Sequence, residues 1–296
     1  MAQVNWRRRL AGSTPPPVRK AVRMAEHYGR RWIEWNHVAA QTFPADARSA
    51  ATFLGSLVVS PVTGLRRLDG FEPPLLLADT VLRVRGIGRF ALRAGTDDII
   101  HVLPAHEPAE LALVQGTLAA GDTFVDAGAN IGFYSIVASG LVGPSGRVIA
   151  VEMMPETARQ LRTNVALNDA TNVRVAEVAL SDRDNDTVTA SSSTRKLGQA
   201  SIAPVRDSLV RDLSVLVRTQ RLDTLLRDVK RVRLMKMDLE GAEALALAGA
   251  FGVLDRVDVI LFENNARDPR VTRLLQQRGF TIRELGHPNY VAERID

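Results

Sequence analysis

The chain has 296 residues, 46% hydrophobic and 24% charged, a globular composition that excludes wholesale disorder. Cysteine is absent, which excludes disulfides, cysteine nucleophiles, iron–sulfur clusters and thiolate zinc sites. The net charge of +5 is concentrated in residues 1–31, which hold eight Lys and Arg and one acid, so the other residues sum to −2. This nearly neutral body argues against a nucleic-acid partner.

Residues 1–100 are predicted to form a basic helical arm and cap. An apolar stripe at helical spacing and five basic residues occur in 18–39. Such a helix either packs its stripe on the main domain or lies on an anionic membrane surface, and both alternatives stay open. Alternation over 80–92 predicts a hairpin around Gly86. No apolar run reaches the roughly 18 residues of a membrane span. We expect a cytoplasmic protein, with peripheral contact to the inner membrane surface through 18–39 as an alternative.

From residue 101 to 296, short apolar strands alternate with helices, which predicts an α/β domain with a parallel sheet and helices on both faces. The predicted strands are 123–126, 147–152, 173–178, 215–219, 232–238, 257–263, 280–285 and 290–294. The predicted helices are 107–119, 133–138, 155–168, 222–229, 242–250 and 269–278. The last two strands indicate an antiparallel edge. The polar segment 187–204 is predicted to be an exposed hairpin or loop.

The segment FVDAGANIGFYS, residues 124–135, places a glycine-rich turn between a strand and a helix. Gly128 allows a tight turn close to a ligand, and Gly132 lets the helix start pack against the strand. Asn130 stands where dinucleotide sites have their pyrophosphate-binding glycine, which argues against a nicotinamide cofactor. Glu152 ends the next strand and is a candidate acceptor for ribose hydroxyls, with a solvated strand-end acid as the alternative.

A second motif, LMKMDLEGAE, follows another apolar strand at residues 234–243. Ligands of open α/β sheets bind beyond the carboxyl ends of the strands, which favours a functional role for Asp238 and Glu240. Lys236 lies two residues before Asp238, so both side chains can point to one side of the sheet, and a buried lysine needs such a carboxylate. Glu263 ends the next strand, and the three carboxylates could form an oxygen-rich Mg²⁺ site.

Together these motifs resemble the FkbM-type family of S-adenosylmethionine-dependent methyltransferases. The glycine loop of that family is similar to FVDAGANIGFYS, and its acidic signature is similar to MKMDLEGAE at 235–243. GPSGRVIAVEMMPE at 143–156 and RLDTLL at 221–226 also match its pattern. The similarity covers roughly residues 97–265 and departs at Met153-Met154, where the family often has Pro-x-Pro.

The resemblance implies a Rossmann-like, seven-stranded class I methyltransferase sheet and S-adenosylmethionine as cofactor. It implies methyl transfer to a hydroxyl of a sugar, glycolipid or polyketide-type natural product, with the substrate chosen by the N-terminal cap. The implied cofactor-binding residues are Asp126, Gly128, Asn130, Gly132, Phe133, Glu152, Ala179, Leu180 and Ser181. The implied catalytic residues are Asp238, Glu240 and Lys236, and Asp238 is the first candidate for a base or a metal ligand.

Other hypotheses remain at this point. A nicotinamide oxidoreductase would need a third loop glycine and a catalytic pair such as Y-x-x-x-K, which the chain lacks. A nucleic-acid methyltransferase would need a run such as N-P-P-Y, which is also missing. A non-catalytic, membrane-associated scaffold that kept the fold stays open, as does a homodimer. His101 and His106 could supply a base from the cap. For each histidine taken singly, an exposed surface residue without a catalytic role is the more common case.

Overall fold

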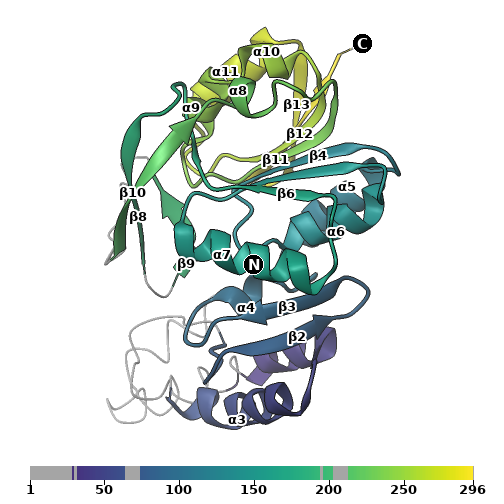
Figure 1. Ribbon diagram of the computed structural model, residues 1–296, viewed down its shortest axis with the longest axis vertical. Coiled ribbons are helices and arrows are strands. Elements are labelled where there is room, and N and C mark those ends of the chain that lie inside the picture. The colour runs from purple at the N-terminus through teal and green to yellow at the C-terminus, as the bar shows by residue number, and fades with distance from the viewer. Residues whose placement is uncertain (1–28, 30–31, 64–73, 194–195, 203–212, 296) are drawn as a thin grey trace, which may run out of the picture.

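The computed structural model describes residues 29, 32–63, 74–193, 196–202 and 213–295 (Figure 1). Most of the predicted basic arm therefore lies outside the described residues. The strands are β1 (Thr42–Pro44), β2 (Thr80–Val84), β3 (Gly88–Leu92), β4 (Thr123–Ala127), β5 (Arg147–Val151), β6 (Val173–Ala176), β7 (Ala179–Leu180), β8 (Thr187–Ser193), β9 (Lys196–Ser201), β10 (Leu213–Gln220), β11 (Val232–Met237), β12 (Val257–Glu263), β13 (Phe280–Gly286) and β14 (Asn289–Arg294). The helices are α3 (Ala47–Thr63), α4 (Asp98–His101), α5 (Pro108–Thr117), α6 (Phe133–Val142), α7 (Pro155–Leu167), α8 (Leu222–Leu225), α9 (Glu243–Ala248), α10 (Phe251–Leu254) and α11 (Pro269–Gln277).

Seven strands form the central sheet in the order β13-β14-β12-β11-β4-β5-β6. Neighbouring strands run parallel from β12 to β6, and β14 is antiparallel to both of its neighbours. The seven-stranded α/β sheet is therefore confirmed, and the last strand along the chain lies inside the sheet while β13 forms its edge. The central strands are buried on both faces, which explains their nearly continuous apolar runs.

Helices cover both faces of this sheet (Figure 1). α5, α6 and α7 lie on one face, and α8, α9, α10 and α11 lie on the other. Each face buries its own apolar cluster. The strands β4, β5, β11 and β12 run parallel, so their carboxyl ends point the same way. The loops that follow these strands therefore meet at one side of the molecule.

A second sheet of four strands, ordered β7-β10-β8-β9, stands beside the first. The predicted strand 215–219 is β10, so its type is confirmed, but it joins this side sheet rather than the central one. The predicted polar hairpin is β8 with β9. The predicted helix 222–229 is shorter than expected, because α8 ends at Leu225.

The N-terminal part packs under α6 and α7 (Figure 1). Its hairpin, β2 with β3, confirms the prediction for 80–92. Helix α3 was not predicted, although Asp46 is a cap signal and its Oδ1 accepts the Ser49 N–H at 2.8 Å. A helix over residues 32–41 buries Trp35 against Phe53, with ring centroids 5.7 Å apart. In the described part of the predicted amphipathic helix, Trp35 and Ala39 of the stripe therefore pack on the protein, and Trp32 is exposed.

The N-terminal part and the sheet share one apolar cluster, which contains Trp35 and Phe90 together with Phe124 and Phe133. A domain boundary near residue 100 stays a prediction. Among the described helices, none is both long and apolar enough to cross a membrane.

Candidate active site

The glycine loop joins β4 to α6 and has left-handed backbone at three alternate positions. The φ angles are +88° at Gly128, +48° at Asn130 and +93° at Gly132. A Cβ atom on Gly128 would lie 1.9 Å from the carbonyl oxygen of Asp238, so this close approach requires glycine. A Cβ atom on Gly132 would lie 2.4 Å from Cδ1 of Leu161 on α7. The predicted roles of both glycines in a tight turn and a close helix contact are thus visible in the backbone.

Glu152 follows β5 and folds back onto this loop. Its Oε2 accepts the Asn130 N–H at 3.0 Å, and its Oε1 accepts the Met154 N–H at 2.9 Å. Burial raises the pKa of the Glu152 carboxyl to about 7, against the opposing effect of these two hydrogen bonds. Two of its roughly four lone-pair sites remain for a ligand. The carboxyl is therefore fixed in place by the loop and still able to accept hydrogen bonds.

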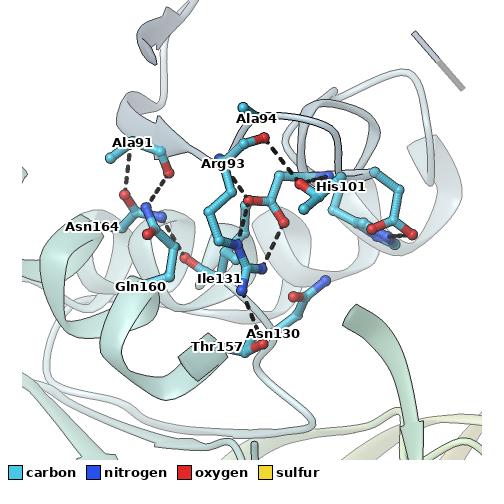
Figure 2. Close-up of polar contacts among 12 residues, drawn as sticks. Ala91, Arg93, Ala94, His101, Asn130, Ile131, Thr157, Gln160 and Asn164 are labelled. Carbon is cyan, nitrogen blue, oxygen red and sulfur yellow. Dashed lines mark hydrogen bonds and ion pairs between the residues drawn. The ribbon is translucent and has the colours of Figure 1, made fainter. Parts of the chain in front are cut away.

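The N-terminal hairpin holds the other side of the glycine loop (Figure 2). Asn164 on α7 accepts the Ala91 N–H of β3 at 2.8 Å and donates to the Ile131 carbonyl at 2.8 Å. Arg93 forms an ion pair with Asp98 at 2.7 Å. The same guanidinium donates to the Thr157 hydroxyl at 3.3 Å. These bonds tie the loop to the cap as well as to the sheet.

The acidic strand end begins with a buried lysine at the end of β11. Lys236 Nζ donates to Asp238 Oδ2 at 2.8 Å and lies 4.9 Å from the centroid of the Tyr134 ring. Burial destabilises the charged ammonium of Lys236 and by itself would lower its pKa. The negative charges of Asp238, Glu107 and Asp126 outweigh this effect and raise the pKa of Lys236. The Tyr134 hydroxyl donates to Glu107 Oε2 at 2.9 Å. The predicted pairing of Lys236 with Asp238 is confirmed.

Three carboxylates gather beyond β11 and β12. One oxygen each of Asp238, Glu240 and Glu263 can be chosen so that all three lie within 4.8 Å of one another. Burial, then the charges of Asp238 and Glu240, raise the pKa of Glu263 to about 9. Burial opposes ionisation of Asp238 as well, but the Lys236 ammonium and a hydrogen bond from Glu263 lower its pKa. At neutral pH the pair therefore presents one ionised and one protonated carboxyl.

Two histidines complete this end of the site. His101 ends α4, and His106 lies in the turn before α5, with ring centroids 5.7 Å apart at an interplanar angle of 88°. His101 Nε2 is 3.3 Å from Asp97 Oδ2. Sequence reasoning left these histidines as either a base from the cap or surface residues, because nothing in their spacing shows that the fold places both in one cavity with Asp238 and Glu263.

One cavity connects these groups. Its walls include the predicted residues Gly128, Asn130, Glu152, Ala179, Leu180, Asp238, Glu240 and Glu263. It is also lined by residues outside the predicted cofactor-binding and catalytic set, namely His101, His106, Glu107, Val151, Met153, Val178, Ala200, Ile202, Leu239 and Ala242. The side sheet supplies Ala179, Leu180 and Ala200, so this sheet forms one wall of the cavity.

Five predicted residues lie behind the wall rather than in it. Among the described residues lining the cavity, Asp126, Gly132, Phe133, Ser181 and Lys236 are not found. Asp126 is buried, accepts a hydrogen bond from the Ser135 hydroxyl at 2.6 Å and pairs in register with Lys236. The Ser181 hydroxyl donates to its neighbour, Asp182. These residues hold the wall in place and do not face the cavity.

The strand order and the cavity at the carboxyl ends of β4, β5 and β11 define a class I, S-adenosylmethionine-dependent methyltransferase fold. Residues 126–282, a little over half of the chain, match the model of the methyltransferase FkbM domain. The chain belongs to this family of methyltransferases, and the predicted resemblance is confirmed.

Individual relatives are more distant. Methyltransferase 1 of Beauveria bassiana is 27% identical over 183 residues, which cover 54% of this chain and 73% of that protein. The arsenite methyltransferase of Halobacterium salinarum is 46% identical over 63 residues, which cover 21% of this chain and 16% of that enzyme. Among solved structures, a precorrin-6y C5,15-methyltransferase from Geobacter metallireducens is 16% identical with a TM-score of 0.41. That match covers 62% of this chain and 87% of the other.

The residues present fit S-adenosylmethionine. Glu152 offers carboxylate oxygens for a ribose diol, and the side-chain oxygen of Asn130 is buried without a hydrogen-bond partner among the described residues. Such an orphaned acceptor suits the ammonium of a methionine moiety. Met153, Val178 and Leu180 offer an apolar wall for an adenine ring. The missing side chain at Gly128 leaves space beside them.

Proposed function

We propose that this methyltransferase acts on a hydroxyl oxygen of a small polyhydroxylated acceptor, namely a sugar, a glycolipid or a polyketide-type natural product. The observation that carries the proposal is the pairing of Asp238 with Glu263 in the cavity. Near neutral pH, Asp238 is an ionised acceptor and Glu263 is a protonated donor. A hydroxyl group both donates and accepts a hydrogen bond, so it can insert between the two carboxyls, donating to Asp238 and accepting from Glu263.

S-adenosylmethionine supplies a methyl group on a sulfonium, which is already a good leaving group. The work left for the protein is to align the acceptor oxygen and to take up its proton. Alignment of reacting groups contributes about 7–11 kcal/mol in favourable cases. Asp238 and Glu263 would orient the acceptor hydroxyl, and Lys236 would position Asp238. Glu152 and Asn130 would hold the cofactor at the opposite end of the cavity.

The carboxylate cluster also has the oxygen donors that Mg²⁺ prefers. Lys236 already supplies a positive charge to Asp238, so neutralisation of the cluster does not by itself require a metal. A Mg²⁺ requirement stays a prediction, and adding EDTA to the transfer assay tests it. Peripheral membrane contact through 18–39 and a homodimer also stay proposals. In the described part of that segment, Trp32 is exposed and Trp35 is buried.

The first experiment is a calorimetric titration of the protein with S-adenosylhomocysteine, using NAD as the control ligand. We expect micromolar binding of the first and none of the second. Transfer of a labelled methyl group from S-adenosylmethionine is then measured with sugars, glycolipids and polyketide alcohols as acceptors. Absence of S-adenosylhomocysteine binding would favour the scaffold hypothesis, and methylation of amines but not hydroxyls would overturn the proposed acceptor class.

Two variants assign the parts of the site. Asp238→Asn keeps the shape of the side chain, and we expect it to retain most affinity for S-adenosylhomocysteine but to lose transfer. Asp228→Asn is the matched control, because Asp228 is exposed and distant from the cavity. Unchanged transfer in Asp238→Asn would remove Asp238 from the acceptor site.

A further inference from the structure

The proton of the acceptor hydroxyl must pass to a group that faces the cavity. Asp238 Oδ2 already accepts from Lys236, and Asp238 is hydrogen-bonded to Glu263 as well. Both oxygens of Glu152 accept backbone N–H groups. These carboxylates are held as hydrogen-bond acceptors for the protein itself. Their remaining lone pairs can orient a hydroxyl, but the Lys236 ammonium lowers the pKa of Asp238 and makes its carboxylate a weak base, so proton uptake calls for a group that titrates nearer neutral pH.

His106 meets this requirement. It lines the cavity, and the described residues provide no hydrogen-bond partner for its imidazole ring. Asp238 lines the same cavity, and its charge acts on the His106 ring. A neutral imidazole carries one free lone pair and is a common general base. The position and the chemistry of His106 therefore suit proton uptake.

His101 is held differently from its neighbour. Its Nε2 lies 3.3 Å from Asp97 Oδ2. Burial by itself would lower the pKa of His101, but the hydrogen bond and the negative charge of Asp97 outweigh burial and raise it. Desolvation and the positive charge of His101 lower the pKa of His106. The two rings therefore titrate apart, because His101 holds its proton more tightly than an ordinary histidine and His106 holds it less tightly. This arrangement keeps a proton-free ring facing the acceptor.

We propose that His106 accepts the proton of the acceptor hydroxyl and that Asp97 and His101 position and tune it. This inference rests on the proposed transfer to a hydroxyl. The acceptor oxygen forms its bond to the methyl carbon while the carbon–sulfur bond breaks and its electron pair stays on sulfur. The hydroxyl proton passes to the free ring nitrogen of His106, which becomes an imidazolium and loses the proton to water after the product departs. His106 is the catalytic residue, and Asp97 and His101 are positioning residues.

Several other charged groups face the two rings and must be separated from them in a pH profile. His101 faces Asp97, Asp98 and Glu107, and His106 faces Glu107, Glu110, Asp238 and His101 itself. Glu152 titrates near pH 7 and acts through cofactor binding, so saturating cofactor removes its contribution to kcat. Glu263 titrates near pH 9 and affects the alkaline side. We therefore expect the acidic limb of the kcat profile to report the titration of His106.

Nuclear magnetic resonance of the histidine Cε1–H groups tests the pair without turnover. The full-length protein is titrated between pH 5 and 8.5, and signals are assigned with His101→Gln and His106→Gln. We expect His101 to titrate above an ordinary histidine and His106 below it. In Asp97→Asn, His101 should lose its proton at lower pH and His106 should titrate at higher pH. Two independent histidines with ordinary titration would overturn the proposed tuning.

Kinetics test the proton transfer. With saturating cofactor and the acceptor that the screen identifies, we expect His106→Gln to lower kcat about 10²- to 10⁴-fold and to remove the acidic limb. Affinity for S-adenosylhomocysteine should not change. Asp97→Asn and His101→Gln should keep the acidic limb but move it to higher pH. His37→Gln is the matched control, because His37 is exposed on the helix over 32–41, away from the cavity.

The outcomes separate this inference from the function on which it rests. If His106→Gln keeps kcat and the acidic limb while Asp238→Asn loses transfer, the proton goes to Asp238 and the role of His106 is refuted. If the wild type binds S-adenosylhomocysteine but methylates no hydroxyl, the proposed function fails and this inference falls with it. If all variants lose S-adenosylhomocysteine binding equally, the histidines are structural and the inference is wrong.

Discussion

Replacing Gly128 with alanine tests the central contact of the site, at which the glycine loop touches the end of β11. The added Cβ would lie 1.9 Å from the Asp238 carbonyl oxygen and 2.9 Å from its carbonyl carbon. An ordinary carbon–oxygen contact is over 1 Å longer than the first distance, so one of the two backbones must move. Either movement separates the cofactor loop from the acidic strand end.

Two costs add in this variant. Left-handed backbone at a φ of +88° costs an alanine about 1–2 kcal/mol. Overpacking against a fixed backbone costs about 1–3 kcal/mol more. We therefore expect the free energy of unfolding to fall by about 2–5 kcal/mol. Gly86→Ala is the matched control, because Gly86 has a φ of +72° with nothing within 4 Å of an added Cβ. That variant should show the first cost alone.

The assay is urea denaturation of both variants at 25 °C, together with titration of each by S-adenosylhomocysteine. Gly128→Ala should lose more stability than Gly86→Ala and should also bind the ligand more weakly, since Asp238 and Asn130 no longer keep their spacing. Equal stability losses with unchanged affinity in both variants would refute the close contact and the reasoning built on it.

Three further predictions concern the residues around the loop. Glu152→Ala removes the carboxylate that would accept the ribose hydroxyls and should weaken S-adenosylhomocysteine binding by about 1–3 kcal/mol in calorimetry; unchanged affinity would remove Glu152 from the cofactor site. Folding raises the pKa of Glu152 from 4.5 to about 7, so the folded state holds this proton more tightly and stability should fall as pH rises. Relative to Glu152→Gln, the wild type should lose roughly 2 kcal/mol between pH 5.5 and 8 in urea denaturation, and a flat difference would contradict that shift. Arg93→Ala leaves the buried Asp98 without its partner and should cost about 3–5 kcal/mol of unfolding free energy, whereas Arg227→Ala, in an exposed pair, should cost almost nothing; equal losses would argue against the buried pair.

Local patterns predicted most of the central sheet and much of the candidate site. The two loop glycines need positive φ, and such positions are encoded in a few adjacent residues. Lys236 and Asp238 lie two apart on a strand end, so their contact follows from the strand period alone. The hairpin of β2 and β3 follows from alternation on both sides of Gly86. In each case the information lies within a short stretch of chain.

The features that sequence reasoning missed depend on contacts between distant segments. The polar strands β8 and β9 lack apolar alternation, and β10 leaves the central sheet to pair with them. The family resemblance implied that Asp126 binds the cofactor, but its buried carboxylate accepts a hydrogen bond from Ser135 on α6 and is not among the described residues that line the cavity. His101 and His106 line the same cavity as Asp238, from which they are separated by more than 130 residues of sequence. No local period reports such a juxtaposition.

The cap enters the site at two separate points, and this changes what it can do. Through Ala91 and Asn164 it fixes the carbonyl of Ile131 in the glycine loop, and through α4 it places His101 and His106 beside the carboxylates. A cap that served only to cover the domain would need neither set of contacts. Because the same short segment after β3 also carries the Arg93–Asp98 pair, a movement of the cap would shift the loop and the histidines together. If the acceptor binds against the cap and moves it, the cofactor loop would shift as well, without any direct contact between the two ligands.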